Sequence, residues 1–279
     1  MNKTNIYGLD DYLSIHLSKR CNLKCPHCYQ TTYQSQVVSV DDVKKAVNIF
    51  FPKWLVLYGG EPMIEQKTIR QIIDTFPDKK YLIYTNGTIW NKDIFERMDK
   101  IVVTIESFIY EEAVKYRNMS REQHQKTINL ITTYKNKCEI LHNIYPTSHD
   151  KLFYRMAHLL NVKVQSYPII LNSSEFKFNE SVLESNIFHY MQPNRFPKMR
   201  LLEDGTLTRD MRGIYNLCHV NEWNNSYEDI SLPISDKCLN CKYLNYCPAS
   251  SIFPHFVYDI LKVQENPHFC KMTEAVYGR

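Results

Sequence analysis

Short strand-like runs of apolar residues alternate with longer helix-like runs from about residue 12 to about residue 170. An apolar period of two residues marks a strand, and a period near 3.6 marks a helix. The sequence predicts six strands, at Tyr12–Leu17, Trp54–Tyr58, Tyr81–Thr85, Ile101–Ile105, Glu139–Ile144 and Val162–Tyr167. It predicts five helices between them, at Val40–Phe50 (opened by Ser39 as N-cap), Lys67–Thr75, Lys92–Met98, Arg121–Tyr134 and Leu152–Leu160. The alternation therefore predicts an α/β fold, a partial (β/α)6 barrel with reactive groups in loops at the carboxyl ends of its parallel strands.

The alternation ends after about residue 170, where the sequence becomes irregular and polar. We therefore expect two domains, the barrel over residues 1–170 and a small irregular domain over residues 171–279. The segment EDGTL, residues 203–207, predicts a β-hairpin in the second domain. The apolar core of that domain would be too thin to fold alone, so we expect a bound metal to supply the missing stability.

Composition narrows the class of protein. With 44% apolar and 23% charged residues, the chain is neither disordered, nor collagen-like, nor a coiled coil. No apolar run approaches the roughly 18 residues of a membrane span, and the first residues lack the apolar core of a secretion signal. The net charge is only +4 and basic residues cluster in pairs, which argues against a groove for double-stranded nucleic acid. We expect a soluble, cytoplasmic protein without a membrane partner.

The chain contains nine cysteines, which fall into two groups. Cys21, Cys25 and Cys28 form the first group, and Cys138 lies alone in the middle of the chain. The second group lies near the carboxyl end and comprises Cys218, Cys238, Cys241, Cys247 and Cys270. Because the cytosol keeps thiols reduced, clustered cysteines there usually serve metal binding or catalysis. The two groups predict two metal centres.

The first group lies in CNLKCPHCY, residues 21–29, directly after the first predicted strand. Spacings of three and two residues let one short loop wrap one face of a cluster. Thiolates of this kind suit iron-sulfur clusters, which ordinarily take four ligands. Three cysteines would leave one iron open to a substrate or cofactor. A zinc site with His27 as the fourth ligand is the alternative, although structural zinc motifs favour two short pairs.

The pattern C-x3-C-x2-C with Tyr29 beside the last cysteine resembles the signature of radical S-adenosylmethionine (SAM) enzymes. The resemblance implies that Cys21, Cys25 and Cys28 hold a 4Fe-4S cluster and that Tyr29 lies at the cofactor. It also implies that SAM binds the fourth iron and is cleaved reductively to a 5'-deoxyadenosyl radical, which abstracts hydrogen from the substrate. The electron would come from a flavodoxin- or ferredoxin-like donor.

Two further motifs extend the resemblance. YGGEP, residues 58–62, follows the second predicted strand and is similar to the family's GGEP element. This implies that Gly59, Gly60, Glu61 and Pro62 contact the amino group of SAM. Thr85-Asn86-Gly87 is similar to the turn that ends the third strand beneath the cofactor. Each motif taken alone is also compatible with an ordinary turn.

The fourth predicted strand is followed by Glu106 and Ser107. Relatives often carry a polar residue here that touches the SAM ribose, so the resemblance implies that role for these two residues. Arg117, a little further on, is similar to the arginine that pairs with the SAM carboxylate. An exposed arginine at the start of a helix is the alternative for Arg117.

The second group contains C-x2-C-x5-C at Cys238, Cys241 and Cys247, followed by the distant Cys270. This pattern resembles half of the SPASM (twitch-like) domain of radical SAM enzymes that modify peptides and proteins. It implies that the four cysteines bind a second, auxiliary 4Fe-4S cluster. Asp210 and Ser251 occupy positions where the other auxiliary cluster of that domain would require cysteines. A four-cysteine zinc site is the alternative.

Two cysteines remain outside these sets. Cys218 is a candidate hydrogen donor that quenches a substrate radical, an additional cluster ligand, or a buried apolar residue. Cys138 lies within a strand pattern and is expected in the core.

The partial SPASM resemblance implies a peptide or protein substrate that is crosslinked, oxidised or epimerised. The first predicted strand begins near residue 12, so we expect a leader peptide to need a separate leader-binding protein or a direct groove. A small metabolite or a nucleotide is the second hypothesis, because the chain is short for a SPASM enzyme. A non-catalytic iron-sulfur binding protein is the third, and the intact cysteine triplet and GGEP argue against it.

Overall fold

The structure is a computed structural model that describes residues 11–28, 30, 36–144, 150–168, 199–208, 216–224, 236–242, 270 and 274. Tyr29 and Cys247 lie outside the described residues, as does the predicted domain boundary between residues 170 and 171.

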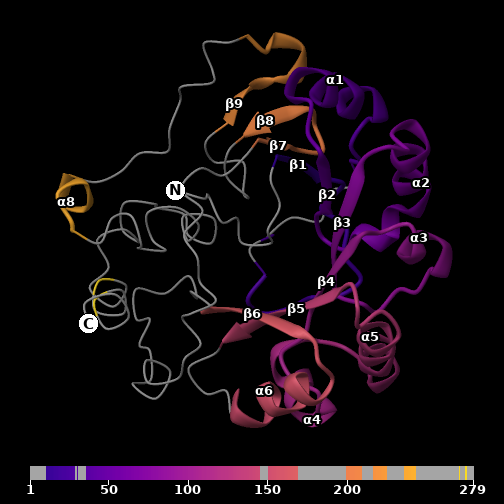
Figure 1. Cartoon of the computed structure of the whole chain (residues 1–279), viewed down its shortest axis with the longest axis vertical. Helices are drawn as coiled ribbons and strands as arrows, with labels where there is room; N and C mark the ends of the chain where they lie inside the picture. Colours follow the sequence, from indigo (N-terminus) through magenta and orange to yellow (C-terminus); the bar gives the residue numbers. More distant parts are fainter. Residues whose placement is uncertain are drawn as a thin grey trace.

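One sheet organises the described part of the chain, with strand order β6-β5-β4-β3-β2-β1-β7-β8-β9 (Figure 1). The pairs from β6 to β7 are parallel, whereas β8 and β9 join as antiparallel strands. The strands are β1 Tyr12–His16, β2 Trp54–Tyr58, β3 Lys80–Thr85, β4 Lys100–Thr104, β5 Cys138–Ile144, β6 Lys163–Pro168, β7 Arg200–Leu201, β8 Thr206–Thr208 and β9 Asn216–His219. The predicted α/β fold is confirmed, and each of the six predicted strands ends within one residue of the observed one.

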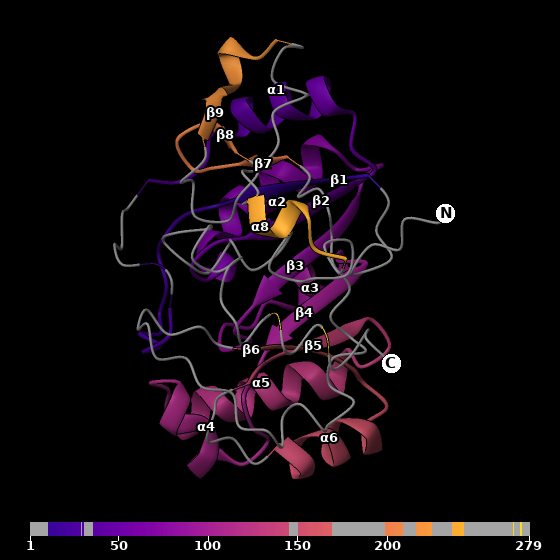
Figure 2. The same ribbon diagram turned by 90° about the vertical axis from the view of Figure 1, so that its left-hand side faces the viewer.

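The helices α1, α2, α3 and α5 lie along the outer side of the curved sheet (Figure 1). Figure 2 looks at the inner side, with α1 at one end of the sheet and α4 and α6 at the other. The helices are α1 Val40–Phe50, η1 Pro62–Glu65, α2 Gln66–Thr75, α3 Lys92–Glu96, α4 Tyr110–Tyr116, α5 Arg121–Thr133, α6 Asp150–Leu159, η3 Val220–Glu222 and α8 Asp236–Leu239.

Local sequence explains where the longer helices begin. The Ser39 hydroxyl accepts a hydrogen bond from the Asp41 amide and caps α1, as predicted. A capping box opens α5, where Ser120 and Gln123 bond each other's backbone amides through their side chains. The sequence did not predict η1 and α4, which are short elements of four and seven residues.

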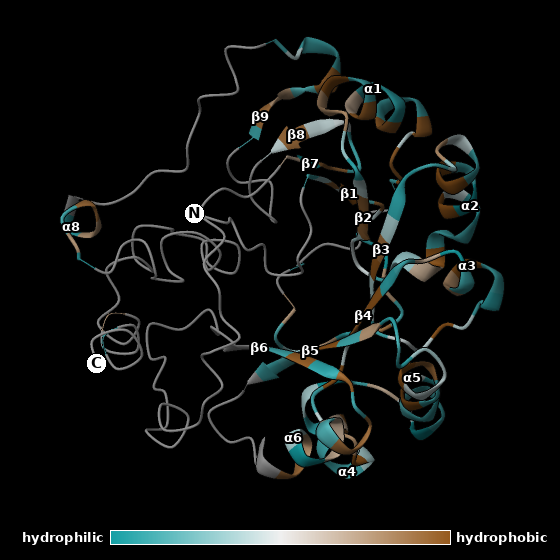
Figure 3. Cartoon of the chain, in the orientation of Figure 1, coloured by the Kyte–Doolittle hydropathy of each residue, from teal (hydrophilic) through white to brown (hydrophobic). Residues whose placement is uncertain are grey.

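Both faces of the parallel sheet carry clusters of apolar side chains. Leu13, Ile15, Leu55 and Leu57 point to the outer face and join the main core under the helices. The inner face carries a second apolar cluster, comprising Trp54, Val56, Leu82 and Val102 with Tyr12, Tyr84 and Leu141 packed against it. Figure 3 shows hydrophobic stretches along the strands of the sheet, interrupted by hydrophilic ones. Parallel sheets covered on both faces have this composition, so the inner face is suited to a site that excludes water.

The predicted hairpin at residues 203–207 is confirmed as the turn between β7 and β8. Gly205 in this turn has φ +83°, a left-handed conformation that glycine adopts without strain. Leu201 and Leu207 belong to the same apolar core as Leu13 of β1. The sheet therefore includes residues from both sides of the predicted domain boundary, and the division into two domains remains a prediction.

Within the described ranges, none of the helices combines the length and the hydrophobicity that a membrane span requires.

Candidate functional site

The cysteine loop begins at the carboxyl end of β1 and is joined to the segment that follows β2. The Gly60 amide donates to the Ser18 carbonyl at 2.9 Å, and the Glu61 amide donates to the Arg20 carbonyl at 2.8 Å. These bonds continue the β1–β2 pairing past the ends of both strands. Cys21 therefore starts its loop directly beside the Gly-Gly-Glu-Pro segment.

The three thiols of the first group are partly buried and lie close enough to influence one another. Burial raises the pKa of Cys25 to about 11, and Cys28 and Cys21 add to the effect while Arg117 opposes it. Burial also raises the pKa of Cys21, which again interacts with Cys28. The Cys28 amide donates to the Cys25 carbonyl at 3.0 Å and closes a tight turn between these two residues. The loop thus gathers three soft sulfur donors at one end of the sheet.

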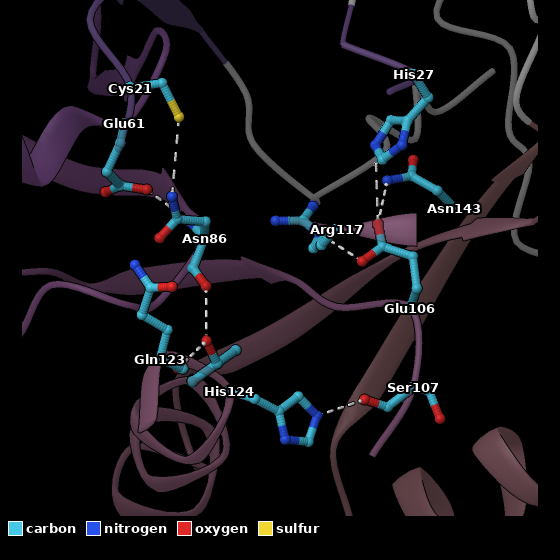
Figure 4. Close-up of polar contacts among 11 residues, drawn as sticks. Cys21, His27, Glu61, Asn86, Glu106, Ser107, Arg117, Gln123, His124 and Asn143 are labelled. Carbon is cyan, nitrogen blue, oxygen red and sulfur yellow. Dashed lines mark hydrogen bonds and ion pairs between the residues drawn. The ribbon is translucent and has the colours of Figure 1, made fainter. Parts of the chain in front are cut away.

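His27 does not complete a four-ligand set. Its Nε2 atom lies 3.9 Å from Oε1 of Glu106, which follows β4 (Figure 4). Burial lowers the pKa of His27 to about 4, so the ring is neutral at pH 7. Across the residues that the structure describes, no group of three or more His, Cys, Asp and Glu side chains is arranged to hold a single metal ion. A donor set of three thiols without a fourth ligand fits an iron-sulfur cluster better than zinc.

The two glycines of the YGGEP segment allow the close approach of the two loops. A Cβ atom on Gly60 would lie 2.2 Å from the Arg20 carbonyl oxygen, and one on Gly59 would lie 2.5 Å from that of Ser18. Gly59 also has φ +152°. No other residue type fits at these positions without moving backbone atoms.

We expect the substitution Gly60→Ala to lower the free energy of unfolding by about 1–3 kcal/mol, because the added methyl group overlaps backbone that cannot rotate away. Denaturant unfolding measures this loss. Asp78→Ala, at an exposed turn, is the control and should change stability by less than about 0.5 kcal/mol. Equal stability of Gly60→Ala and the parent protein would contradict the packing described above.

Glu61 is buried, and its carboxylate ties the ends of β2 and β3 together. It accepts hydrogen bonds from the Thr85 hydroxyl at 2.7 Å and from the amides of Asn86 at 2.7 Å and Met63 at 3.0 Å. Burial raises the pKa of Glu61, and the three donors oppose that shift. Pro62 occupies the first turn of η1, where its missing amide hydrogen is not needed. The side chain of Glu61 therefore supports the turn, and Gly59 and Gly60 bring its backbone against the cysteine loop.

Asn86 connects the third strand to the cysteine loop (Figure 4). Its Nδ2 atom donates to Oδ1 of Asn22 at 3.0 Å and lies 4.0 Å from the sulfur of Cys21. Its Oδ1 atom accepts from the amide and the hydroxyl of Thr88. Thr127 of α5 donates to the Asn86 carbonyl at 2.9 Å and supports the turn from outside. The predicted Thr85-Asn86-Gly87 turn is thus beside the first cysteine.

Glu106 and Arg117 form a buried ion pair, in which Nε of Arg117 donates to Oε2 of Glu106. Asn143 of β5 donates to the other oxygen of Glu106 at 2.9 Å. Burial alone would raise the pKa of Glu106, but Arg117, His27 and Asn143 outweigh it and lower the pKa. Arg117 lies at the end of α4 and is buried, so the alternative of an exposed arginine at the start of a helix is wrong. The pair stands next to the cysteine loop, since Arg117 also interacts with Cys25 and Cys21.

Ser107 shapes the chain after β4. Its hydroxyl accepts from the Ile109 amide at 3.1 Å, and its carbonyl oxygen lies 3.0 Å from Nε2 of His124 in α5. These contacts set the turn that leads into α4. The predicted contact of Ser107 with a cofactor remains a prediction.

The sequence did not single out Glu65, which anchors the start of the cysteine loop. Its buried carboxylate accepts from the Ser18 hydroxyl at 2.6 Å and from Nε of Arg20 at 2.7 Å, and Nη2 of Arg20 binds its second oxygen. A pair of bonds from one guanidinium fixes orientation as well as distance. The residues are more than 40 positions apart, so no local pattern in the sequence reveals the contact.

A second unpredicted network lies where β1 meets β7. Nδ1 of His16 lies 2.7 Å from Oε2 of Glu203, and Nζ of Lys19 lies 2.9 Å from the other oxygen. Gln30 lies 3.0 Å from Nε2 of His16. Burial opposes the charge on Glu203, but His16 and Lys19 lower its pKa to about 2. Glu203 is therefore an anion at neutral pH whose charge is already compensated.

The structure places Cys270 within electrostatic range of Cys238 and Cys241. Burial raises the pKa of Cys270, and its neighbours Cys238 and Cys241 add to the shift. Cys238 and Cys241 are joined by a turn in which the Cys241 amide donates to the Cys238 carbonyl at 3.0 Å. Helix α8, which carries Cys238, stands away from the sheet on the side opposite α1–α3 (Figure 1). Cys247, the fourth predicted ligand, is outside the described residues.

The remaining two cysteines pack with apolar residues. Cys138 is 4% exposed in β5, as expected for a core residue, and burial raises its pKa to about 12. Cys218 in β9 pairs with the buried Leu207 and packs against the main core. Cys218 is partly buried, so its position fits the alternative of a buried apolar residue only in part, and its role as a hydrogen donor remains a prediction.

The fold and the site together define a class of protein. A curved, mostly parallel sheet carries three thiols at the carboxyl end of its first strand, with glycine-rich and polar loops from β2, β3 and β4 around them. This arrangement fits α/β enzymes that carry their reactive groups at the carboxyl ends of the strands, with thiols suited to an iron-sulfur cluster.

The family comparison agrees with this class. The family model described as "Radical SAM superfamily" matches residues 15–160, which are more than half of the chain. The chain belongs to the radical SAM superfamily and is a radical SAM enzyme, and the family implies a 4Fe-4S cluster and SAM.

Relatives and solved structures give the wider context. The "Antilisterial bacteriocin subtilosin biosynthesis protein AlbA" of Bacillus subtilis (strain 168) is 28% identical over 145 residues, which are 46% of this chain and 32% of AlbA. The "S-adenosylmethionine-dependent nucleotide dehydratase" of Fibrobacter sp. (strain UWH6) is 25% identical over 185 residues, 61% of this chain and 49% of that protein. The matches thus span about half or less of these two relatives.

Streptococcus suis SuiB has a similar fold. Its structure bound to S-adenosylmethionine aligns with a TM-score of 0.64 at 13% identity and covers 86% of this chain and 72% of SuiB. The structure of SuiB bound to precursor peptide SuiA aligns with a TM-score of 0.61, again at 13% identity, and covers 86% of this chain and 71% of SuiB.

Proposed function

We propose that this radical SAM enzyme abstracts hydrogen from a residue of a peptide or protein substrate, which ends as a crosslink, an oxidation or an epimerised centre. The observation that supports the proposal is that Cys270 lies within electrostatic range of Cys238 and Cys241, across 28 intervening residues, in the order of a SPASM-like site. With Cys247, these residues would give a fully ligated auxiliary 4Fe-4S cluster. Full ligation suits electron transfer or scaffolding, which the SPASM-containing peptide-modifying enzymes share.

Different residues around the first cysteine group have different roles in the proposed SAM site. We assign Cys21, Cys25 and Cys28 to the cluster that binds SAM, which supplies the 5'-deoxyadenosyl radical when bound. The backbone of Gly59 and Gly60 lies against this loop and is placed to take the SAM amino group. Arg117 supplies positive charge for the SAM carboxylate, and Glu106 holds Arg117 in place.

The remaining predicted contacts follow from the same arrangement. Thr85 and Asn86 support the floor of the site through Glu61 and Cys21, and we expect Ser107 and Tyr29 at its edge. The apolar inner face of β2, β3 and β4 would exclude water from the reacting groups.

The relatives support a peptide substrate, and one of them favours an alternative. AlbA is named for the biosynthesis of a bacteriocin, and SuiB was crystallised with a precursor peptide. The nucleotide dehydratase supports the second candidate, modification of a nucleotide. The SPASM-like cysteines favour the peptide. We further propose a cytoplasmic location, a flavodoxin- or ferredoxin-like electron donor, a separate leader-binding protein and the two-domain division at residues 170/171.

Two measurements test the proposal. The full chain, reconstituted without oxygen, is expected to hold about eight irons and eight sulfides, whereas about four with one zinc would contradict the auxiliary cluster. Co-expression with short peptides encoded beside its gene should change the mass of one peptide, and Cys25→Ala should prevent the change. If nucleotides are converted and no such peptide is, the nucleotide alternative replaces the proposal.

A further inference from the structure

Arg200 is a cation on the inner face of the sheet, next to the candidate site. It lies in β7 and pairs in register with Ser14 of β1. In a parallel pair, residues in register point to the same face. Leu201 and its partner Ile15 belong to the outer core, so Arg200 and Ser14 point to the inner face.

The side chain of Arg200 extends toward the carboxyl ends of the strands. Its guanidinium carbon lies 5.6 Å from the ring centroid of Tyr58, a cation–π contact. Tyr58 is the partner of His16, two residues further along β1 than Ser14. Since Tyr58 directly precedes Gly59 and Gly60, the guanidinium stands beside the loop assigned to SAM.

Three tyrosines from three strands frame this cation. Burial opposes the charge of Arg200, but electrostatic interactions with Tyr58, Tyr12 and Tyr84 and a hydrogen bond with Tyr58 outweigh it and raise the pKa of the guanidinium. Tyr84 directly precedes Thr85 and Asn86, so the frame also reaches the third-strand turn. The guanidinium is thus charged at neutral pH, and the ring of Tyr58 lies against it.

No carboxylate balances Arg200 among the residues that the structure describes. Its Nε atom is buried and has no hydrogen-bond acceptor there, and it takes part in none of the ion pairs. Glu203, three residues away, is already bound by His16 and Lys19. Tyr58 gives the partly buried guanidinium a neutral hydrogen-bond partner and an aromatic face, but no group among the described residues neutralises its charge. A cation kept in this state suggests that an anionic ligand completes the site.

We propose that Arg200, framed by Tyr12, Tyr58 and Tyr84, binds a carboxylate of the substrate and holds the substrate beside the SAM site. A guanidinium matches a carboxylate with two parallel hydrogen bonds, and tyrosine hydroxyl groups can donate to the same oxygens. That the carboxylate belongs to a peptide, as an acidic side chain or a terminal carboxyl, rests on the proposed function. Arg200 is then a specificity-determining residue of this enzyme.

The first test is thermal unfolding of the full reconstituted chain without substrate. If the charge of Arg200 is neutralised only by a bound ligand, Arg200→Met removes an uncompensated charge from the free protein. The thermal unfolding midpoint of the variant should then equal or exceed that of the parent protein. Arg155→Met, at an exposed position of α6, makes the same change of charge and serves as control. A midpoint several degrees below that of the control would show that Arg200 is structural and would overturn the proposal.

The second test uses small probes with the same protein. N-acetyl-glutamate methylamide carries one carboxylate, and N-acetyl-glutamine methylamide replaces it with an amide of the same shape. The carboxylate probe should raise the unfolding midpoint of the parent protein and the amide should not. Arg200→Met should need about ten times more of the carboxylate probe to reach the same midpoint shift, or should show no shift, because it lacks the pair of charge-assisted hydrogen bonds. Arg200→Lys keeps the charge but not the paired geometry, so the carboxylate probe should shift its midpoint less than that of the parent protein and more than that of Arg200→Met.

The outcomes separate this inference from the proposed function. Neither test needs turnover, so selective carboxylate binding through Arg200 would stand even if the natural substrate were not a peptide. Peptide modification that proceeds with unchanged KM in Arg200→Met would overturn the inference and leave the proposed function intact. A larger midpoint shift with methyl phosphate than with the carboxylate probe would overturn the carboxylate assignment, as would no shift with the carboxylate probe.

Discussion

Cys25→Ala is expected to reduce the formation of 5'-deoxyadenosine from SAM to background and to remove about four irons per chain. Each of the three thiols in the loop would serve a different iron, so the loss of one leaves a second iron without a protein ligand. Among the described thiols of this loop, Cys25 has the most strongly raised pKa, and it lies between Cys21 and Cys28 in the sequence. The measurements are iron analysis and product detection after anaerobic reconstitution with dithionite and SAM.

Cys138→Ala is the matched control for this prediction. Cys138 is also a buried thiol, but it lies in β5 with its sulfur 3.8 Å from the Glu139 carbonyl oxygen and far from the loop in sequence. This variant should keep its iron and its activity. Full activity in Cys25→Ala, or equal loss in both variants, would contradict the assignment of the cluster to this loop.

Arg117→Met is expected to lower the free energy of unfolding by about 3–5 kcal/mol, because it leaves the carboxylate of Glu106 buried without its cation. Glu106 is 1% exposed at its side chain and Arg117 6%, so water cannot replace the lost partner. The double variant Arg117→Met/Glu106→Gln removes both charges and should recover much of the loss. Denaturant unfolding of the parent protein, Arg117→Met, Glu106→Gln and the double variant completes the double-mutant cycle.

The same pair predicts a dependence on pH. In the parent protein the pKa of Glu106 is lowered, so the pair stabilises the fold above the unfolded value of about 4 and less so as pH falls below it. In Arg117→Met, burial would raise the pKa of Glu106. As pH falls, protonation of Glu106 therefore removes the buried charge and stabilises the variant relative to the parent protein. The difference between the two proteins should therefore shrink toward acid. A loss below about 1 kcal/mol at pH 7 would show that the ion pair is not a stability determinant.

Much of the fold was predictable because it depends on local periodicity. The runs from Trp54 to Tyr58 and from Val40 to Phe50 were predicted at their observed bounds, since strand and helix periods differ and the flanking residues stop each element. The short helix α4 was not predicted, although it carries Arg117 into the site at its end. Without α4, the sequence could not show that Arg117 turns inward to Glu106.

Motifs within one loop were visible in the sequence, and contacts between loops were not. The spacing of Cys21, Cys25 and Cys28 and the adjacent Gly59 and Gly60 are local properties of the chain. The partners of Glu65 lie 45 and 47 positions earlier, and His16 meets Glu203 only because β7 inserts beside β1. Nothing in the spacing of such residues distinguishes a partner from any other charged residue.

The amino-acid sequence alone determined the alternating strands and helices, the three-thiol loop and the two cysteine groups, because each depends on residues that are neighbours along the chain. Only the tertiary structure decided that Glu106 holds Arg117, that Glu61 joins β2 to β3, and that Arg200 lies against Tyr58 with no acidic partner among the described residues. Those contacts depend on strand order and register, which bring together side chains that the chain itself keeps far apart.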